Sequence, residues 1–277
     1  MAEHTIEVAD IKGKKTPYAR GGSGEPLIYL HSALGETSLF GTPWLGFVDK
    51  LADDFDVIST VHPGFGDAEG ISEIDDIIDL VFHYLDFMDA LGLESAHFVG
   101  HSLGGWLAAE LAAFYPDRVR RLVLSAAVGI WLDDDPIAEI FGVQPAEYAE
   151  LLFADPQSHP LGQALLATDG MRDTGLPRDA DPESLLPAMR ALSATARVGW
   201  NPYLHDPKLA HRLHRVTAPT LVLWGARDSL ISDAYADEWA RLIPDATLRR
   251  LSEIGHMPQL EAEDEWVGAI AEFLSAR

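Results

Sequence analysis

The chain has 277 residues, of which 47% are hydrophobic types, and a formal net charge of -24. This length suits one α/β domain that carries an insertion. Such an acidic surface repels phosphate backbones and anionic lipid head groups, so the sequence argues against nucleic acid or a membrane surface as a partner. The chain has no cysteine, which excludes a disulfide framework, a thiol nucleophile and a cysteine-ligated metal centre.

The first residues of the chain, Met1 to Glu7, have neither the basic start nor the apolar run of a secretory signal. No uncharged stretch approaches the ~18 residues that a membrane-spanning helix needs. We therefore expect a soluble, cytoplasmic protein.

Short apolar runs bounded by turn residues alternate with amphipathic stretches along most of the chain. This alternation is typical of a largely parallel sheet covered by helices, so we predict an α/β fold. Several runs are rich in Val, Ile and Leu, as in strands buried on both faces. The eight predicted strands are Thr5–Val8, Lys15–Arg20, Leu27–Leu30, Val57–Val61, Ala96–Val99, Arg121–Ser125, Thr220–Trp224 and Thr247–Leu251. The predicted covering helices are Ile74–Leu91, Leu103–Tyr115, Ala234–Leu242 and Glu263–Ser275.

The alternation stops between Gly129 and Arg215, where prolines recur and no strand-like run is followed by a helix. We interpret this stretch as a helical cap inserted into the core. The predicted division is core at 1–128 and 216–277 and cap at 129–215, with cap helices at 145–153 and 182–197 and a loop-like stretch at 168–180.

A glycine-flanked serine follows the fifth predicted strand, in the run Gly100-His101-Ser102-Leu103-Gly104. A sharp strand-to-helix turn of this composition exposes the serine hydroxyl, while small neighbours relieve crowding. The strand before it and the helix after it are both predicted, so Ser102 is the candidate nucleophile. The N–H of Leu103, at the start of that helix, is a candidate donor to a developing oxyanion.

A serine hydroxyl needs a general base, which is in turn oriented by a carboxylate. His256 follows the last predicted strand, and Asp228 follows the one before it, so both should lie at the carboxyl edge of the sheet. Asp133 and Glu253 are rival acids. Asp228 could instead cap the helix that begins near Asp233.

The second oxyanion donor should come from the loop after the third strand, His31-Ser32-Ala33-Leu34-Gly35, where position favours the N–H of Ala33. The alternative is an ordinary strand-to-helix loop. A second glycine-containing loop, Pro63–Asp67, ends the fourth strand, and a structural role is the expected one for it.

With these motifs in place, the chain resembles the α/β-hydrolase superfamily, in the serine hydrolase branch with a helical cap after the sixth strand. The resemblance covers nearly the whole chain and implies a Ser102-Asp228-His256 triad, with Ala33 and Leu103 forming the oxyanion hole. One departure is Ser32, which stands where the family usually has glycine, and serine resists the positive φ that glycine adopts freely. The donor among residues 32–34 therefore stays open at this point.

The departure also bears on function. Hydrolases that cleave C–C bonds in ring-fission products usually have a glycine-rich run after that histidine, and this chain has Ser32-Ala33-Leu34. Epoxide hydrolases and haloalkane dehalogenases have an aspartate at the nucleophile position, where this chain has Ser102.

The predicted function is hydrolysis of an ester or lactone through an acyl-enzyme, with no cofactor and no metal. The apolar insertion favours a small-molecule substrate with a hydrophobic portion. The alternatives are a C–C bond hydrolase, an amidase or a cofactor-free perhydrolase and, more distantly, a small-molecule receptor. The candidates for lining the substrate pocket, whose aromatic members could instead form the core of the cap, are Ser32, Trp131, Phe141, Phe153, Trp200 and Tyr203.

Overall fold

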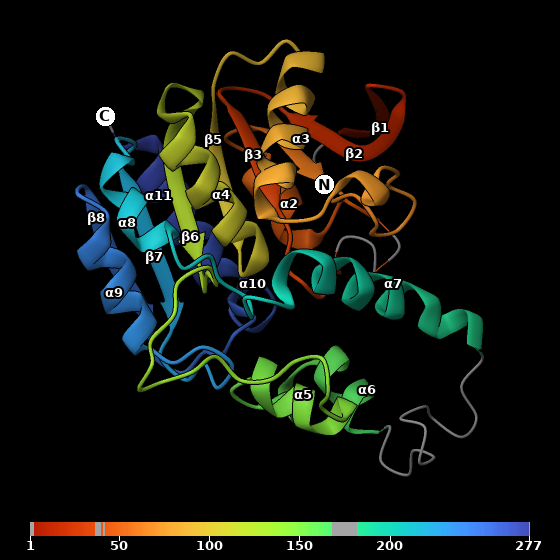
Figure 1. The fold of residues 1–277 in the computed structure, drawn as a ribbon, viewed down its shortest axis with the longest axis vertical. Helices are drawn as coiled ribbons and strands as arrows, with labels where there is room; N and C mark the ends of the chain where they lie inside the picture. The colour runs from red at the N-terminus through yellow and green to blue at the C-terminus, as the bar shows by residue number, and fades with distance from the viewer. Residues whose placement is uncertain (1–2, 37–39, 41, 168–181, 277) are drawn as a thin grey trace.

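The computed structural model describes residues 3–36, 40, 42–167 and 182–276. Eight strands form one sheet in the order β1-β2-β4-β3-β5-β6-β7-β8 (Figure 1). They are β1 (His4–Ile11), β2 (Lys14–Gly22), β3 (Pro26–Leu30), β4 (Asp56–Thr60), β5 (Ala96–His101), β6 (Val119–Ser125), β7 (Thr220–Gly225) and β8 (Ala246–Leu251). The eight predicted strands are thereby confirmed.

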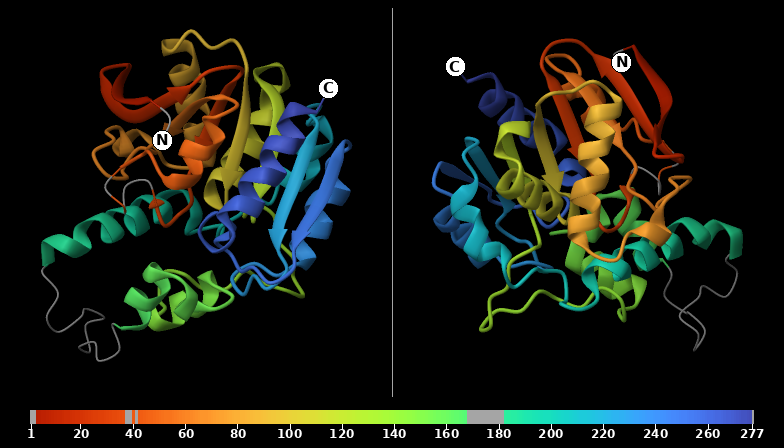
Figure 2. Two further views of the ribbon diagram at one scale, coloured as in Figure 1. Left: turned by 180° about the vertical axis from the view of Figure 1, so that it is seen from behind. Right: turned by 45° about the horizontal axis from the view of Figure 1, so that its top comes forward.

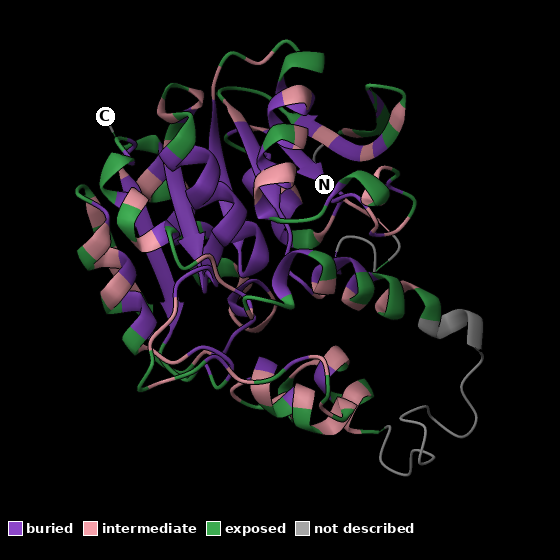
Figure 3. Cartoon of the chain, in the orientation of Figure 1, coloured by how far each residue is buried: buried purple, intermediate pink, exposed green. Residues whose placement is uncertain are grey.

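The sheet is mostly parallel. Strand β1 pairs antiparallel with β2, and β2 pairs antiparallel with β4, whereas all later pairs are parallel. Every residue of β5 and β7 is buried, as expected for central strands covered on both faces (Figure 3). Because β3, β5, β7 and β8 run the same way, the loops that follow them meet at one edge of the sheet.

Helices cover both faces of the sheet. On one face lie α3 (Ile77–Ala90), α4 (Leu103–Phe114) and α9 (Ala234–Leu242), whose buried side chains belong to the larger apolar core. On the other face, α2 (Gly46–Leu51) and α11 (Glu263–Ser275) pack over a second apolar cluster, as the rear view in Figure 2 shows. The four covering helices predicted from sequence are present, and α2 is an additional one.

Three helices that follow β6 and precede β7 in the chain lie on the side of the sheet where the parallel strands end (Figure 1). They are α5 (Pro145–Leu152), α6 (Pro160–Leu166) and α7 (Pro182–Gly199). Helices α5 and α7 correspond to the two predicted cap helices, and α6 was not predicted. The stretch predicted as a loop, 168–180, lies outside the described residues.

The remaining helices are short. They are α8 (Leu209–Arg212), α10 (Pro258–Glu261) and the 3-10 turns η1 (Ile71–Glu73), η2 (Pro116–Arg118), η3 (Pro156–Ser158) and η4 (Leu213–Arg215). Within the described part of the chain, no helix combines the length and the apolar character needed to cross a membrane.

A buried ion cluster joins α4 to α8. Glu110 of α4 is fully buried, and both of its carboxylate oxygens accept hydrogen bonds from Arg212 at 2.9 Å. Arg212 also pairs with Asp206 at 2.6 Å. Burial raises the pKa of Glu110 to about 7, although the nearby Arg212 acts in the opposite direction. The cluster ties the returning end of the cap to the helix behind the candidate nucleophile.

Candidate active site

Ser102 occupies a strained turn between β5 and α4. Its backbone has φ 53° and ψ -111°, in the positive-φ region that side-chain-bearing residues rarely adopt. The neighbouring glycines make this turn possible. A Cβ on Gly100 would lie 2.3 Å from the carbonyl oxygen of Gly104, and a Cβ on Gly104 would lie 2.1 Å from that of Leu30. The glycine pattern is therefore required by backbone contact.

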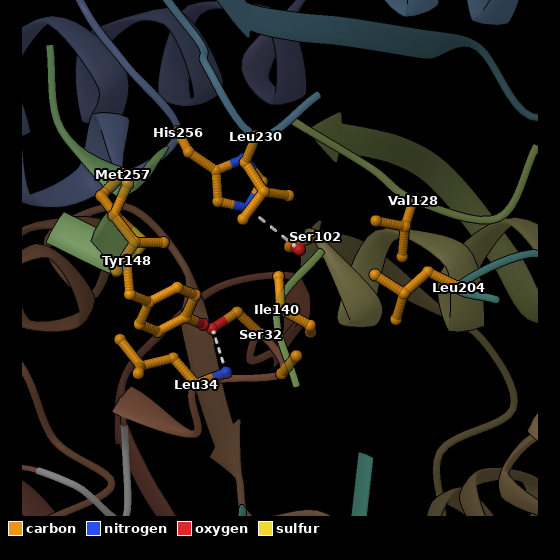
Figure 4. A pocket seen from close by; sticks show the side chains of 12 residues that line it. Ser32, Leu34, Ser102, Val128, Ile140, Tyr148, Leu204, Leu230, His256 and Met257 are labelled. Atoms are coloured by element: carbon orange, nitrogen blue, oxygen red, sulfur yellow. Dashed lines mark hydrogen bonds between the residues drawn. The ribbon is translucent and has the colours of Figure 1, made fainter. Parts of the chain in front are cut away.

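The structure brings Ser102, His256 and Asp228 together. The Ser102 Oγ lies 3.1 Å from Nε2 of His256, and Nδ1 of His256 lies 2.8 Å from Oδ2 of Asp228 (Figure 4 draws the first contact). The other carboxylate oxygen of Asp228 accepts from the N–H groups of Leu230 and Ile231, both at 2.9 Å. With Asp228 as an acceptor, Nδ1 of His256 carries the proton and Nε2 is free to accept one from Ser102. This is the geometry of a nucleophile with its base and orienting acid.

All three side chains are shielded from water, with exposed fractions of 4% for Ser102, 2% for His256 and 8% for Asp228. The rival acids lie elsewhere. Asp133 is exposed, and Glu253 is an exposed residue whose carboxylate pairs with Arg227 at 3.4 Å.

The loop that carries His256 is tied to the cap. The main-chain N–H of His256 donates to the carbonyl oxygen of Leu152, at the end of α5, over 2.9 Å. Glu261 of α10 accepts from the N–H of Ala154 at 2.8 Å and from that of Gly255 at 2.9 Å. Three hydrogen bonds thus fix the histidine loop. Two of them involve Leu152 and Ala154, at the end of α5 and just after it.

The loop after β3, residues 31–36, is referred to below as the oxyanion loop. Its polar groups are almost all engaged internally: the N–H of Ser32 donates to Glu36 at 3.2 and 3.3 Å, the N–H of Leu34 donates to Ser32 Oγ at 3.1 Å, and that of Gly35 donates to Ser32 O at 3.0 Å. Within the described residues, the N–H groups of Ala33 and Leu103 have no hydrogen-bond partner. Ala33 also lines the cavity beside Ser102, so its N–H is a candidate oxyanion donor from this loop.

Ser32 does not suffer the backbone strain that its place in the motif suggests. Among the described residues the positive φ of this loop, 67°, belongs to Gly35, and Ser32 is absent from the positive-φ positions. Its hydroxyl instead donates to Glu36 over 2.5 Å. The serine therefore contributes a side-chain hydrogen bond where a glycine has none.

Glu36 was not identified from the sequence. It is fully buried and also accepts a hydrogen bond from the hydroxyl of Tyr29 at 2.5 Å. Burial by itself would raise the pKa of Glu36, but the net effect of its surroundings is to lower that pKa, and the groups of Ser32 and Tyr29 that hydrogen-bond to it are all donors. The residue is therefore a carboxylate. A single glutamate in a short loop resembles any solvated surface residue, so no sequence signal marks it.

Two buried histidines flank this carboxylate. His31 accepts from the N–H of His62 at 2.9 Å, so its proton is on Nδ1, which donates to Ser32 O at 2.8 Å. The contact also places the second glycine-containing loop beside the oxyanion loop. Burial, reinforced by His256, lowers the pKa of His101 to about 3, so His101 is neutral.

A small cavity lies next to Ser102, and a larger one adjoins it. The smaller has a volume of about 10 Å³, and the larger, of about 200 Å³, extends beneath the cap. Ala33, Leu34, Ile140 and Tyr148 line both cavities and form the constriction between them. In Figure 4, Tyr148 reaches from α5 toward Ser32. The larger cavity is otherwise lined by Phe141, Val143, Pro145, Leu161, Leu165, Ala188, Ala191 and Leu192.

Of the candidates for lining the substrate pocket, Ser32 lines the smaller cavity and Phe141 the larger one. Trp131, Trp200 and Tyr203 line neither of these two cavities, and Phe153 lines a separate one beside Asp228. Trp131 stacks on His205, and Phe153 stacks on His159. The Tyr203 hydroxyl donates a hydrogen bond to the carbonyl of Ala138 and accepts one from the N–H of Ile140. Trp200 packs on Phe141 and is 62% exposed. They stabilise the cap itself, the alternative role expected for aromatic residues in an insertion.

Residues 25–263 match the family described as alpha/beta hydrolase fold. The chain belongs to the α/β-hydrolase family. Among curated relatives it is 30% identical to the dihydrolipoyllysine-residue acetyltransferase component of the acetoin cleaving system of Cupriavidus necator, over 96% of this chain and 68% of the relative. The counterpart from Pseudomonas putida is 29% identical, and the match spans 62% of its length.

Other relatives of this α/β hydrolase match along nearly their whole length. The 2-hydroxy-6-oxo-6-phenylhexa-2,4-dienoate hydrolase of Comamonas testosteroni is 28% identical over 98% of this chain and 95% of the relative. The solved structure of the enzyme of that name from Rhodococcus sp. strain RHA1 has a TM-score of 0.78 at 22% identity, with all of both chains covered. At that identity the structural likeness shows the shared fold.

Proposed function

We propose that this α/β hydrolase is a serine hydrolase that cleaves esters or lactones with an apolar acyl or alkyl portion. The observation that carries the proposal is the hydrogen-bonded chain from Ser102 through His256 to Asp228, buried at the carboxyl edge of the sheet. The unpartnered N–H groups of Ala33 and Leu103 lie in the two segments that flank Ser102 and support the same reaction.

In the proposed mechanism, Nε2 of His256 takes the proton of the Ser102 hydroxyl as Oγ attacks the substrate carbonyl carbon. Asp228 orients the imidazole and stabilises its protonated form. The carbonyl electron pair moves onto oxygen, where the N–H groups of Ala33 and Leu103 stabilise it. His256 then protonates the leaving alcohol, leaving an acyl-enzyme on Ser102, and a water molecule activated by the same histidine releases the acid.

The character of the larger cavity supports an apolar group on the substrate. None of the described residues that line it is charged, and Tyr148 is the polar residue that it shares with the smaller cavity. Dry apolar cavities of roughly 150 Å³ hold a benzene molecule in other proteins, so a volume of about 200 Å³ suits a phenyl ring or a short alkyl chain.

The second candidate reaction is C–C bond hydrolysis, which the names of several relatives favour. A dienoate substrate carries a carboxylate, which is costly to bury without a cationic partner or several hydrogen-bond donors. The described residues that line the two cavities include no lysine or arginine. The described pocket therefore favours a neutral ester or lactone.

A substrate panel tests the proposal. Multiple-turnover assays would compare 4-nitrophenyl esters of short and phenyl-bearing acids, a series of lactones, and a phenyl-substituted ring-fission dienoate. We expect turnover of esters or lactones, with preference for the apolar acyl group, and a loss of about 10⁴-fold or more in kcat for Ser102→Ala. A dienoate hydrolysed with a higher kcat/KM than any ester would overturn the bond assignment. Ester turnover unchanged in Ser102→Ala would overturn the nucleophile.

A further inference from the structure

We propose that Glu36 is a positioning residue of the oxyanion hole, which holds Ser32 so that the N–H of Ala33 faces the reacting carbonyl. The inference rests on the proposed function insofar as Ala33 serves as a donor. Glu36 is neither one of the three proposed triad residues nor one of the residues that line the two cavities.

Three donors converge on this one carboxylate. The main-chain N–H of Ser32 lies 3.2 and 3.3 Å from its two oxygens, the Ser32 hydroxyl lies 2.5 Å away, and the Tyr29 hydroxyl lies 2.5 Å away. A buried charge is costly unless hydrogen bonds satisfy it. Tyr29 belongs to the central strand β3, so the carboxylate links the oxyanion loop to a rigid element of the sheet.

These bonds fix the peptide group between Ser32 and Ala33. The N–H of Ser32 is held by Glu36, the carbonyl of Ser32 accepts from Gly35 at 3.0 Å, and the Ser32 hydroxyl receives the N–H of Leu34 at 3.1 Å. On the following residue, the carbonyl of Ala33 accepts a hydrogen bond from Thr195 of α7 at 3.2 Å. Because the groups on either side are engaged, the direction of the Ala33 N–H is set before substrate binds.

Both oxygens of the Glu36 carboxylate accept hydrogen bonds, as its three donors require. An ionised glutamate offers acceptor sites on both oxygens, whereas a glutamine side chain has one acceptor oxygen and one donor NH₂ group. In Glu36→Gln, at least one of the donors from Ser32 and Tyr29 would face the NH₂ group. The substitution keeps the size of the side chain but removes one of the two acceptor oxygens that share the N–H of Ser32.

The test measures how fast Ser102 reacts with a fluorophosphonate, followed by intact mass in the full-length protein. This reaction also develops negative charge in the oxyanion hole and needs no knowledge of the substrate. We expect Glu36→Gln to react about 10- to 100-fold more slowly than the wild type, because small misplacements of catalytic groups cost up to ~10²-fold. With an accepted ester, kcat should fall by a similar factor while KM changes little.

A matched control separates positioning from loss of stability. Glu110 is also a fully buried glutamate with hydrogen-bonded partners, but its partners are Arg212 and Trp106. Glu110→Gln should lower the melting temperature and leave the labelling rate of Ser102 within about threefold of the wild type. If Glu36→Gln does not fold, Ser32→Ala removes the same link from the other side and should slow labelling likewise.

Labelling of folded Glu36→Gln, or of Ser32→Ala in its place, at the wild-type rate would overturn the inference. The proposed function can fail separately. If the wild type labels at Ser102 but turns over no ester or lactone, the substrate proposal is wrong, and the labelling rates still decide the role of Glu36.

Discussion

Asp228 receives three hydrogen bonds, two from the main chain of its own loop and one from His256. One oxygen accepts from two main-chain N–H groups at 2.9 Å, which fixes the carboxylate relative to its own loop. The other oxygen is thereby directed at His256, 2.8 Å away. An amide at this position would keep the shape of the side chain but could present a donor to Nδ1 of His256.

We predict that Asp228→Asn lowers kcat by about 10⁴-fold, because the imidazole is then held in the wrong tautomer. Steady-state kinetics on an accepted ester would measure the effect. Glu253→Gln is the control, since Glu253 is one of the two rival acids and is exposed. A loss confined to Glu253→Gln, with Asp228→Asn near wild-type activity, would reassign the orienting acid.

The three candidate triad positions could be predicted because each lies in a recognisable local sequence context. A glycine-flanked turn precedes a helix at Ser102, a fully buried strand precedes Asp228, and a partly exposed edge strand precedes His256. Glu36 could not be predicted, because its importance arises from a contact with Tyr29 across the start of the loop. Burial of a single polar residue leaves no periodic trace in a sequence.

At the scale of elements, the strands were predictable because short apolar or alternating runs bounded by turn residues indicate strands. Helix ends depend on capping. Helix α3 begins at Ile77, later than predicted, because the side chain of Asp76 accepts the N–H groups of Ile78 and Asp79 at its start. The short helices α2 and α6 were missed, since six or seven residues give less than two turns of periodicity.

Helix α6 supplies a test of the larger cavity. Leu161 lines it, so Leu161→Trp should fill part of the space and lower kcat/KM for a phenyl-bearing ester by about tenfold or more. An acetate ester should be affected much less. Ala164→Trp, on the exposed side of the same helix, controls for a tryptophan in α6. Equal losses for both esters would show that this cavity does not hold the apolar group.

At the scale of the whole molecule, 44 acidic residues face 20 lysines and arginines. Self-repulsion of this excess opposes folding, and salt screens it. We predict that raising NaCl from 10 to 500 mM at pH 7 stabilises the protein by ~1 kcal/mol, which would raise the melting temperature by about 2–4 °C. Thermal unfolding at pH 5, near the sequence pI of about 4.6, should show a smaller effect. A melting temperature that falls with salt at pH 7 would show that attractive ion pairs dominate.

The hydrogen bond from the main-chain N–H of His256 to Leu152 couples the position of α5 to the position of the catalytic imidazole proposed above. A swing of α5 away from the sheet would stretch this bond and draw the imidazole off Ser102. The molecule would then be unable to react while its interior was open to bulk water on that side. Reaction at Ser102 therefore requires α5 to be seated against the histidine loop.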